Sequence, residues 1–128
     1  MSASRKQVRD WFKEAIETAT SSLGKVYTSR WSIIGEDETD YVLILLEEGN
    51  TLPEHPDVYS SQMSIVINQA VGDDDTLDTA AEAIQNAVVS HNENVNPSPF
   101  DFFETGYVYG GDSDDPTTTL ALQLRIEH

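Results

Sequence analysis

The sequence contains no cysteine among its 128 residues, so disulfide bonds, thiol nucleophiles and thiolate metal sites are all excluded. It also lacks a long apolar run. The longest, residues 41–46, falls far short of the ~20 residues that a membrane-spanning helix needs. The N-terminal segment has no continuous apolar stretch of the kind found in secretory signals. These features predict a soluble intracellular protein with no membrane contact, and the length predicts a single domain over residues 1–128.

Basic residues are nearly absent from most of the chain. Between Trp31 and Leu124 there is no Lys or Arg, against 19 Asp and Glu, and the net charge is -16. Six of the seven basic residues lie in the first thirty positions. A body of this charge repels a nucleic-acid backbone, so we expect no direct grip on DNA. Two interpretations stay open: a solvated or salt-adapted surface, or an acidic wall past which another polyanion slides without adhering.

Two segments have the apolar spacing of amphipathic helices. The first begins near Ser2 or Ser4, either of which suits an N-cap, and ends before Gly24, where a left-handed residue is favoured. The second begins after a cap at one of Asp73–Asp75 and ends in residues 93–99. Their predicted buried stripes are, respectively, Val8, Trp11, Phe12, Ala15, Ile16, Ala19 and Leu23, and Leu77, Ala81, Ile84 and Val88.

The remaining segments favour strands. Residues 25–34 are β-rich, and residues 41–48 are apolar on both parities, which predicts a central strand covered on both faces. Residues 49–57 hold two prolines and are interpreted as a loop, after which residues 58–69 return to alternation. The pattern at the end of the chain predicts a hairpin of residues 101–109 and 117–127 that buries every second side chain of its last strand, Leu120, Leu122, Leu124 and Ile126.

These elements predict an α+β fold, in which a mostly antiparallel sheet of about five strands has two helices packed on it, in the order α-β-β-β-α-β-β.

Motifs of catalysis are missing. The sequence has no HExxH, GxSxG, P-loop or GxGxxG pattern. His91, at the expected end of a helix, is explained by the helix dipole. A Ser–His–Asp group assembled from distant residues stays open, but we expect no enzyme and no cofactor. The acidic clusters lack the spacing of a calcium loop. Weak binding of divalent cations stays an alternative.

Four features occur together in this chain. They are a short N-terminal helix, "YVLILLEEG" followed by "YSSQMSIVINQA", a helix rich in small and acidic residues, and the ending "GYVYGGDSDDPTTTLALQLRIEH". In these features the chain resembles the tail terminator family of long-tailed bacteriophages, the family of the lambda-type minor tail protein U. The likeness spans nearly the whole chain.

The resemblance implies a structural role without catalysis. Members form a homo-oligomeric ring of six subunits that binds the head-proximal end of the tail tube and stops its polymerisation. The ring presents a surface to the head–tail connector protein, and DNA passes through its central hole without specific binding. The implied location is the virion tail, and the host cytoplasm during assembly.

Within such a ring, particular residues are candidates for contact. We expect the basic residues of the first helix, Arg5, Lys6, Arg9 and Lys13, to pair with an acidic neighbour. Phe102 and Phe103 have opposite parity in a strand, so we expect a neighbouring subunit to cover at least one of them. Loops 36–40, 49–57 and 110–116 are expected to contact the tube or connector. Their candidate residues are Glu36, Asp37, Glu38, Leu52, Glu54, His55, Asp112, Asp114 and Asp115.

Three rival interpretations are compatible with the sequence. One is another phage tail or head–tail connector subunit, which differs from a terminator only in how it stacks. Another is a monomeric acidic adaptor or nucleic-acid mimic, which would bind a basic partner through residues 31–124. The last is a small enzyme, which would need a concave pocket that holds paired titratable groups.

Overall fold

The computed structural model describes residues 3–19, 23–29, 40–70, 73–110 and 118–128. Two α-helices and a five-stranded sheet follow one another in the predicted order, so the predicted α+β class is confirmed. The elements are α1 (Arg5–Ala19), β1 (Lys25–Tyr27), β2 (Tyr41–Leu52), β3 (His55–Gln69), α2 (Asp74–Ser90), the π-helical turn η2 (His91–Val95), β4 (Asp101–Gly110) and β5 (Thr118–Glu127).

The sheet has the strand order β1-β2-β3-β5-β4. Its neighbours pair antiparallel except β1 and β2, which are parallel. The antiparallel pairing of β4 with β5 confirms the predicted C-terminal hairpin. The strand order places β4 at one edge of the sheet. Strand β1, of only three residues, forms the other edge.

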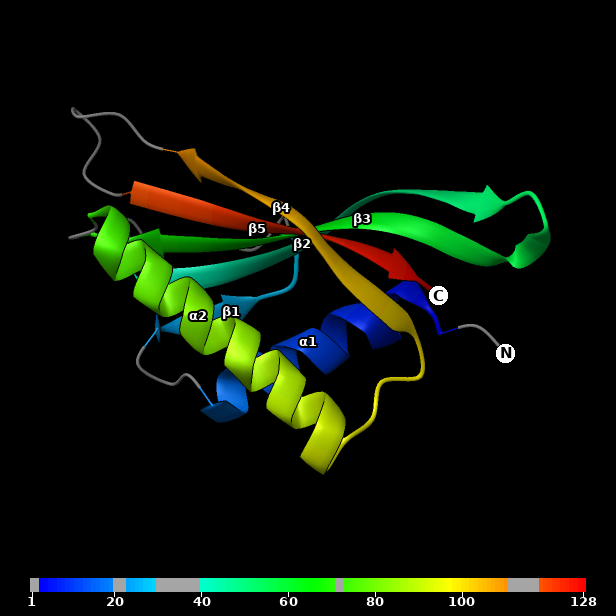
Figure 1. Cartoon of the computed structure of the whole chain (residues 1–128), viewed down its shortest axis with the longest axis horizontal. Coiled ribbons are helices and arrows are strands. Elements are labelled where there is room, and N and C mark those ends of the chain that lie inside the picture. Colours follow the sequence, from blue (N-terminus) through cyan, green and yellow to red (C-terminus); the bar gives the residue numbers. More distant parts are fainter. Residues whose placement is uncertain (1–2, 20–22, 30–39, 71–72, 111–117) are drawn as a thin grey trace.

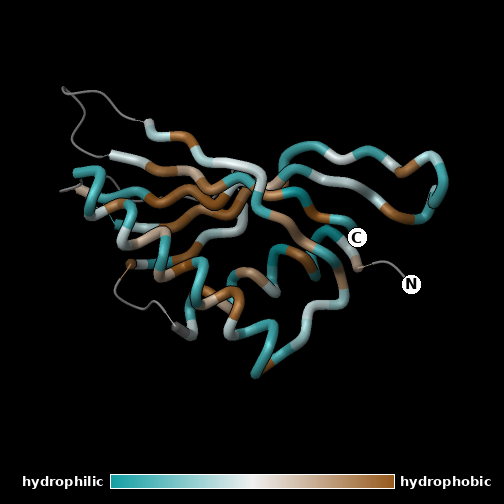
Figure 2. Tube along the Cα trace, viewed as in Figure 1, coloured by the Kyte–Doolittle hydropathy of each residue, from teal (hydrophilic) through white to brown (hydrophobic). Residues whose placement is uncertain are grey.

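Both helices lie on the same face of the sheet (Figure 1). The apolar stripe of α1, from Val8 to Ile16, and that of α2, from Leu77 to Val88, are buried against alternate residues of β2, β3 and β5. Figure 2 shows hydrophobic residues concentrated in the central strands and recurring along both helices. Within the described residues, no helix is long and apolar enough to cross a membrane.

The opposite face of the sheet carries no helix among the described residues. One apolar row runs across it in register, through Tyr27, Leu43, Val66, Ala121 and Val108. Except for Val108, which is exposed, these residues are only half-buried. The expectation that the strand at residues 41–48 is covered on both faces is therefore not met in this part of the chain.

Both helix starts are capped as the sequence predicts. Ser4 Oγ accepts from the Gln7 backbone amide at 3.1 Å, and the Gln7 side chain accepts in return from the Ser4 amide at 2.7 Å. This reciprocal pair is a capping box. Asp73 Oδ1 accepts from the Thr76 amide at 2.8 Å, and this bond lowers the pKa of Asp73. The caps set where each apolar stripe begins.

Two backbone segments approach each other closely at the point where the parallel strands β1 and β2 begin. Gly24 has a φ of +85°, and a Cβ built there would lie 1.9 Å from the carbonyl oxygen of Asp40. Only glycine fits, because any side chain would be strained by the left-handed backbone and would also collide with a neighbouring main chain.

We predict that Gly24→Ala lowers the free energy of unfolding by about 2–4 kcal/mol, because the new methyl group displaces the start of β2. Gly106→Ala is the matched control, since its Cβ would meet only Gln123 Oε1 at 3.7 Å, an ordinary contact. Urea unfolding measures both variants. Equal stability of the two variants would contradict the close approach at Gly24.

Candidate subunit interface and contact surfaces

The basic side of α1 consists of Arg5, Lys6, Arg9 and Lys13. Lys6 pairs with Asp10 one turn along the helix, and Lys13 Nζ lies 3.6 Å from the Glu17 carboxylate. Within the described residues, Arg5 and Arg9 form no ion pair. These two guanidinium groups are therefore available to an external acid, as the expectation for this helix requires.

The basic side of α1 adjoins the β1 edge of the sheet. Lys6 and Arg9 line an open hollow of about 360 Å³ together with Thr28 and Ser29, which directly follow β1. Asp10 and two β2 residues, Leu45 and Leu46, complete this hollow. Two leucines, hydroxyl groups and charged side chains therefore meet in this hollow, and Arg9 is its one charged group without an ion pair in the described residues.

The opposite edge of the sheet has a different chemical character. Strand β4 pairs with β5 along its length, and no described strand lies on its outer side. It exposes four large apolar side chains, with exposed fractions of 46% for Phe103, 65% for Tyr107, 51% for Val108 and 40% for Tyr109. A long edge strand with apolar side chains is a template for pairing with another chain.

A β-bulge at Thr105 decides which way the tyrosines point. The register with β5 shifts between Glu104 and Gly106, and the Thr105 hydroxyl donates to the Gln123 carbonyl at 3.2 Å. The extra residue places Tyr107 and Tyr109 on the helix side of the sheet, opposite Leu122 and Leu120. The two rings meet edge to face, 5.6 Å apart.

Two side-chain bonds connect β4 to α2. Gln85 Nε2 donates to Glu104 Oε1 at 2.7 Å, and the Tyr109 hydroxyl donates to the Asp78 carboxylate. The bond to Asp78 raises the pKa of Tyr109 to about 12, with smaller contributions from desolvation and the charges of Asp78 and Asp74. The β4 edge is thus acidic as well as apolar.

Phe102 and Phe103 point to opposite faces, as their parity predicts. Phe102 is half-buried and packs against Trp11 and Phe12, with ring centroids 5.6 Å and 5.4 Å away. Phe103 lies on the open face, where the Arg125 guanidinium sits over its ring at 5.2 Å. Phe103 is therefore the member of the pair that another subunit has room to cover.

The expectation of a loop at residues 49–57 is wrong. These residues extend β2 and β3 past the rest of the sheet as a two-stranded arm, turning at Pro53 and Glu54 (Figure 1). Pro56 lies where the pairing register slips between Leu52 and Thr51, so it interrupts no regular ladder. Leu52, Glu54 and His55 lie at the tip of the arm, where Glu54 and His55 are exposed and Leu52 is half-buried.

Of the predicted contact loops 36–40 and 110–116, the structure describes only Asp40, which precedes β2, and Gly110, which ends β4. Glu36, Asp37, Glu38, Asp112, Asp114 and Asp115 lie outside the described residues. Within the part of the chain that the structure describes, no group of three His, Asp or Glu side chains is arranged to hold a metal ion. Asp73 serves as a helix cap instead.

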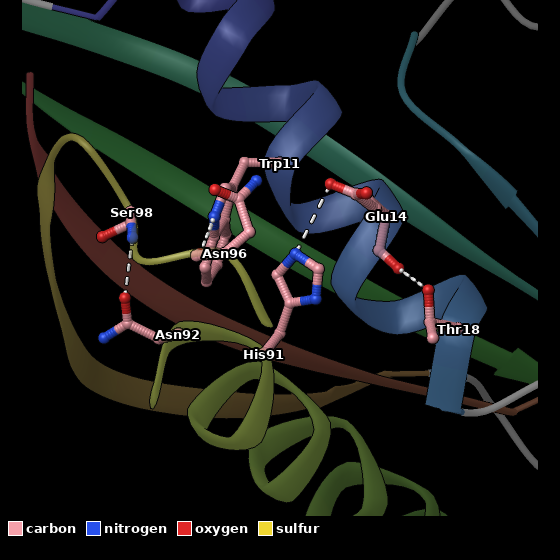
Figure 3. Close-up of polar contacts among 7 residues, drawn as sticks. All are labelled: Trp11, Glu14, Thr18, His91, Asn92, Asn96 and Ser98. Carbon is pink, nitrogen blue, oxygen red and sulfur yellow. Dashed lines mark hydrogen bonds and ion pairs between the residues drawn. The ribbon is translucent and has the colours of Figure 1, made fainter. Parts of the chain in front are cut away.

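Two histidines have roles that sequence reasoning missed. His91 is buried, with its ring 5.1 Å from that of Trp11 and its Nε2 3.4 Å from a Glu14 carboxylate oxygen (Figure 3). That nitrogen makes no hydrogen bond. Trp11 Nε1 donates to the Asn96 carbonyl at 2.9 Å. His91 is the C-cap of α2, at the helix end where it was expected, and it also belongs to the α1–α2 contact.

His128 holds the end of β5 against the base of the arm. Its Nε2 lies 2.7 Å from Ser61 Oγ, its Nδ1 lies 3.0 Å from the Ala3 carbonyl, and its ring stacks on Tyr59. Gly49 faces Ser61, where a Cβ would lie 2.4 Å from the hydroxyl. Ser61 and His128 are both buried. In a catalytic Ser–His–Asp triad a carboxylate holds the second ring nitrogen of the histidine, whereas here the Ala3 carbonyl lies at that position. The pair is a structural lock in this geometry.

Comparison with models of known protein families and with curated protein sequences finds no match to this chain.

We predict that Tyr109 ionises with a midpoint near pH 12. The measurement is the tyrosinate absorbance of the unaltered chain minus that of Tyr109→Phe, followed as a function of pH. A tyrosine whose folded pKa exceeds its ordinary value of 10.0 adds stability below pH 10 and loses it as pH rises through 12. Tyr107→Phe is the control and should retain the late step. A difference titration centred near pH 10 would contradict the bond to Asp78.

Proposed function

We propose that the chain is a structural virion subunit, a phage tail terminator that forms a ring on the head-proximal end of the tail tube. The observation that carries this proposal is the outer edge of β4, a ten-residue strand with four exposed large apolar side chains and no described partner. Such an edge is an aggregation liability in a solitary particle and an asset in a closed assembly.

The distribution of charge supports the same proposal. Arg5 and Arg9, which have no ion pair within the described part of the chain, lie on α1, and the carboxylates of α2 and β4 lie on another side of the molecule. A closed ring uses heterologous contacts, in which one side of a subunit meets a different side of the next. Opposite charges on the two sides favour this head-to-tail arrangement over two-fold pairing.

The arm gives the ring a means of contacting a second protein. A two-stranded hairpin without support from a third strand is only marginally stable in water. Beyond Tyr59, whose backbone bonds to His128, the arm has no such support in the described residues. We assign Leu52, Glu54 and His55 at its tip to contact with the tail tube or the connector, and the ring opening to the passage of DNA.

The mass in solution is expected to correspond to a closed ring, with six copies as the family resemblance implies. Light scattering with negative-stain images measures it. Rings that stop tail-tube polymerisation support the terminator. Stacks that lengthen without limit favour a tube subunit, and a monomer at every concentration favours the acidic adaptor; either result contradicts the proposal.

We predict that Leu52→Asp leaves the ring intact and lowers its affinity for tube ends at least about tenfold, because a charge enters an apolar contact at the arm tip. Thr51→Asp, one residue earlier in the same strand, is the matched control. The measurement is the length distribution of tubes assembled with increasing amounts of each variant. Unimpaired length control by Leu52→Asp would remove the arm from the tube contact.

A further inference from the structure

The two ends of the sheet are chemically complementary. At the β4 end, exposed aromatic and apolar side chains lie beside the carboxylates Asp101 and Glu104 of the strand and Asp78 of α2. At the β1 end, the basic side of α1 borders the hollow floored by Leu45 and Leu46. The β4 end thus offers protruding apolar groups with negative charge. The β1 end offers a recess in which Leu45 and Leu46 lie beside Arg9, while Lys6 is already paired with Asp10.

We propose that the occupant of the β4 edge is a second copy of this chain, which covers it with its own β1 edge and the basic side of its α1. The inference rests on the proposed ring and names the surfaces that close it. In this arrangement Tyr107, whose side chain is 65% exposed, enters the neighbour's hollow beside Arg9. Carboxylates of β4 face Arg5 and Arg9 of the neighbour.

The chemistry of the contact has a precedent inside the chain. Arg125 already sits over the ring of Phe103, so the open face next to β4 uses a guanidinium to cover an aromatic ring. Arg9 over Tyr107 repeats this arrangement between subunits. Arg5 and Arg9 have no ion pair in the described residues of their own chain, so the contact breaks no existing pair.

The contact is directional, which makes a strict test available. Asp101→Lys/Glu104→Lys reverses the β4 end and leaves α1 basic, so each copy repels its neighbour. Arg5→Glu/Arg9→Glu reverses the α1 end and leaves β4 acidic, with the same result. A mixture of the two variants restores attraction at both junctions, because the lysines of one meet the glutamates of the other. The restored rings must then alternate.

The experiment measures mass by light scattering at low salt, where screening is weak. We expect each variant alone to lose the ring and run as a monomer, and an equimolar mixture to regain the ring mass with a 1:1 composition by native mass spectrometry. Circular dichroism confirms that each variant is folded. Glu54→Lys/Glu93→Lys is the control, because it makes the same charge change as Asp101→Lys/Glu104→Lys at exposed residues of the arm tip and of η2. This variant should keep the ring.

The outcomes separate the two proposals. Rings that survive in either reversed variant, or a mixture that stays monomeric, overturn the edge pairing while leaving the terminator proposal intact. A mixture that regains alternating rings confirms the pairing, even where those rings fail to stop tube growth and the terminator proposal falls. An unaltered chain that is monomeric at every concentration overturns both.

Discussion

The apolar layer between the helix pair and one face of the sheet is the interaction on which the rest of the structure depends. Phe12, Ile16 and Ile84 reach from the helices into this layer and are fully buried there. Because both helices are used on one face, none among the described residues covers the other face or the outer side of β4. The core thus fixes a rigid body and determines which surfaces are left to meet another molecule.

Those remaining surfaces are specialised in different ways. The β4 edge is apolar and acidic, the β1 edge is recessed and basic, and the arm extends past the sheet at the end where β5 finishes. The bulge at Thr105 and the bonds from α2 hold the β4 edge in one orientation, while the lock between His128 and Ser61 holds the base of the arm. A preorganised edge loses little conformational entropy when it binds, which suits the ring subunit that we propose.

Local patterns predicted most of the fold. Ser4 and Asp73 mark helix starts because capping depends on neighbouring residues only, and the alternation in residues 120–126 defines a strand with one buried side. Gly24 has the positive φ expected of it, but the first helix ends earlier, at Ala19. The arm was not predictable in this way, since Pro53 and Pro56 are typical of a loop. Whether a proline breaks a ladder depends on its place in the register, and the pairing partner sets that register.

The candidate site was predictable only in part. The charge split identified the basic side of α1. Parity showed that Phe102 and Phe103 point to opposite faces, but only the packing of Phe102 against Trp11 and Phe12 identifies Phe103 as the outward one. The contacts of His91 and His128 escaped prediction because their partners are distant in sequence; His128 reaches Ala3 across 125 positions. That no described strand pairs with the outer side of β4 likewise depends on strand order, which no local pattern encodes. Aromatic residues in "GYVYG" indicated a strand but could not indicate an edge.

The central claim is that copies of this chain join β4 edge to β1 edge in a closed circle. The absence of cysteine allows a direct measurement with Thr28→Cys/Tyr107→Cys and a short bis-maleimide cross-linker. Four strand spacings separate these edges within one chain, about 19 Å, which a short linker cannot span. The account predicts a ladder of cross-linked chains that ends at one fixed size. An uncross-linked chain, or a ladder without an upper limit, would contradict it.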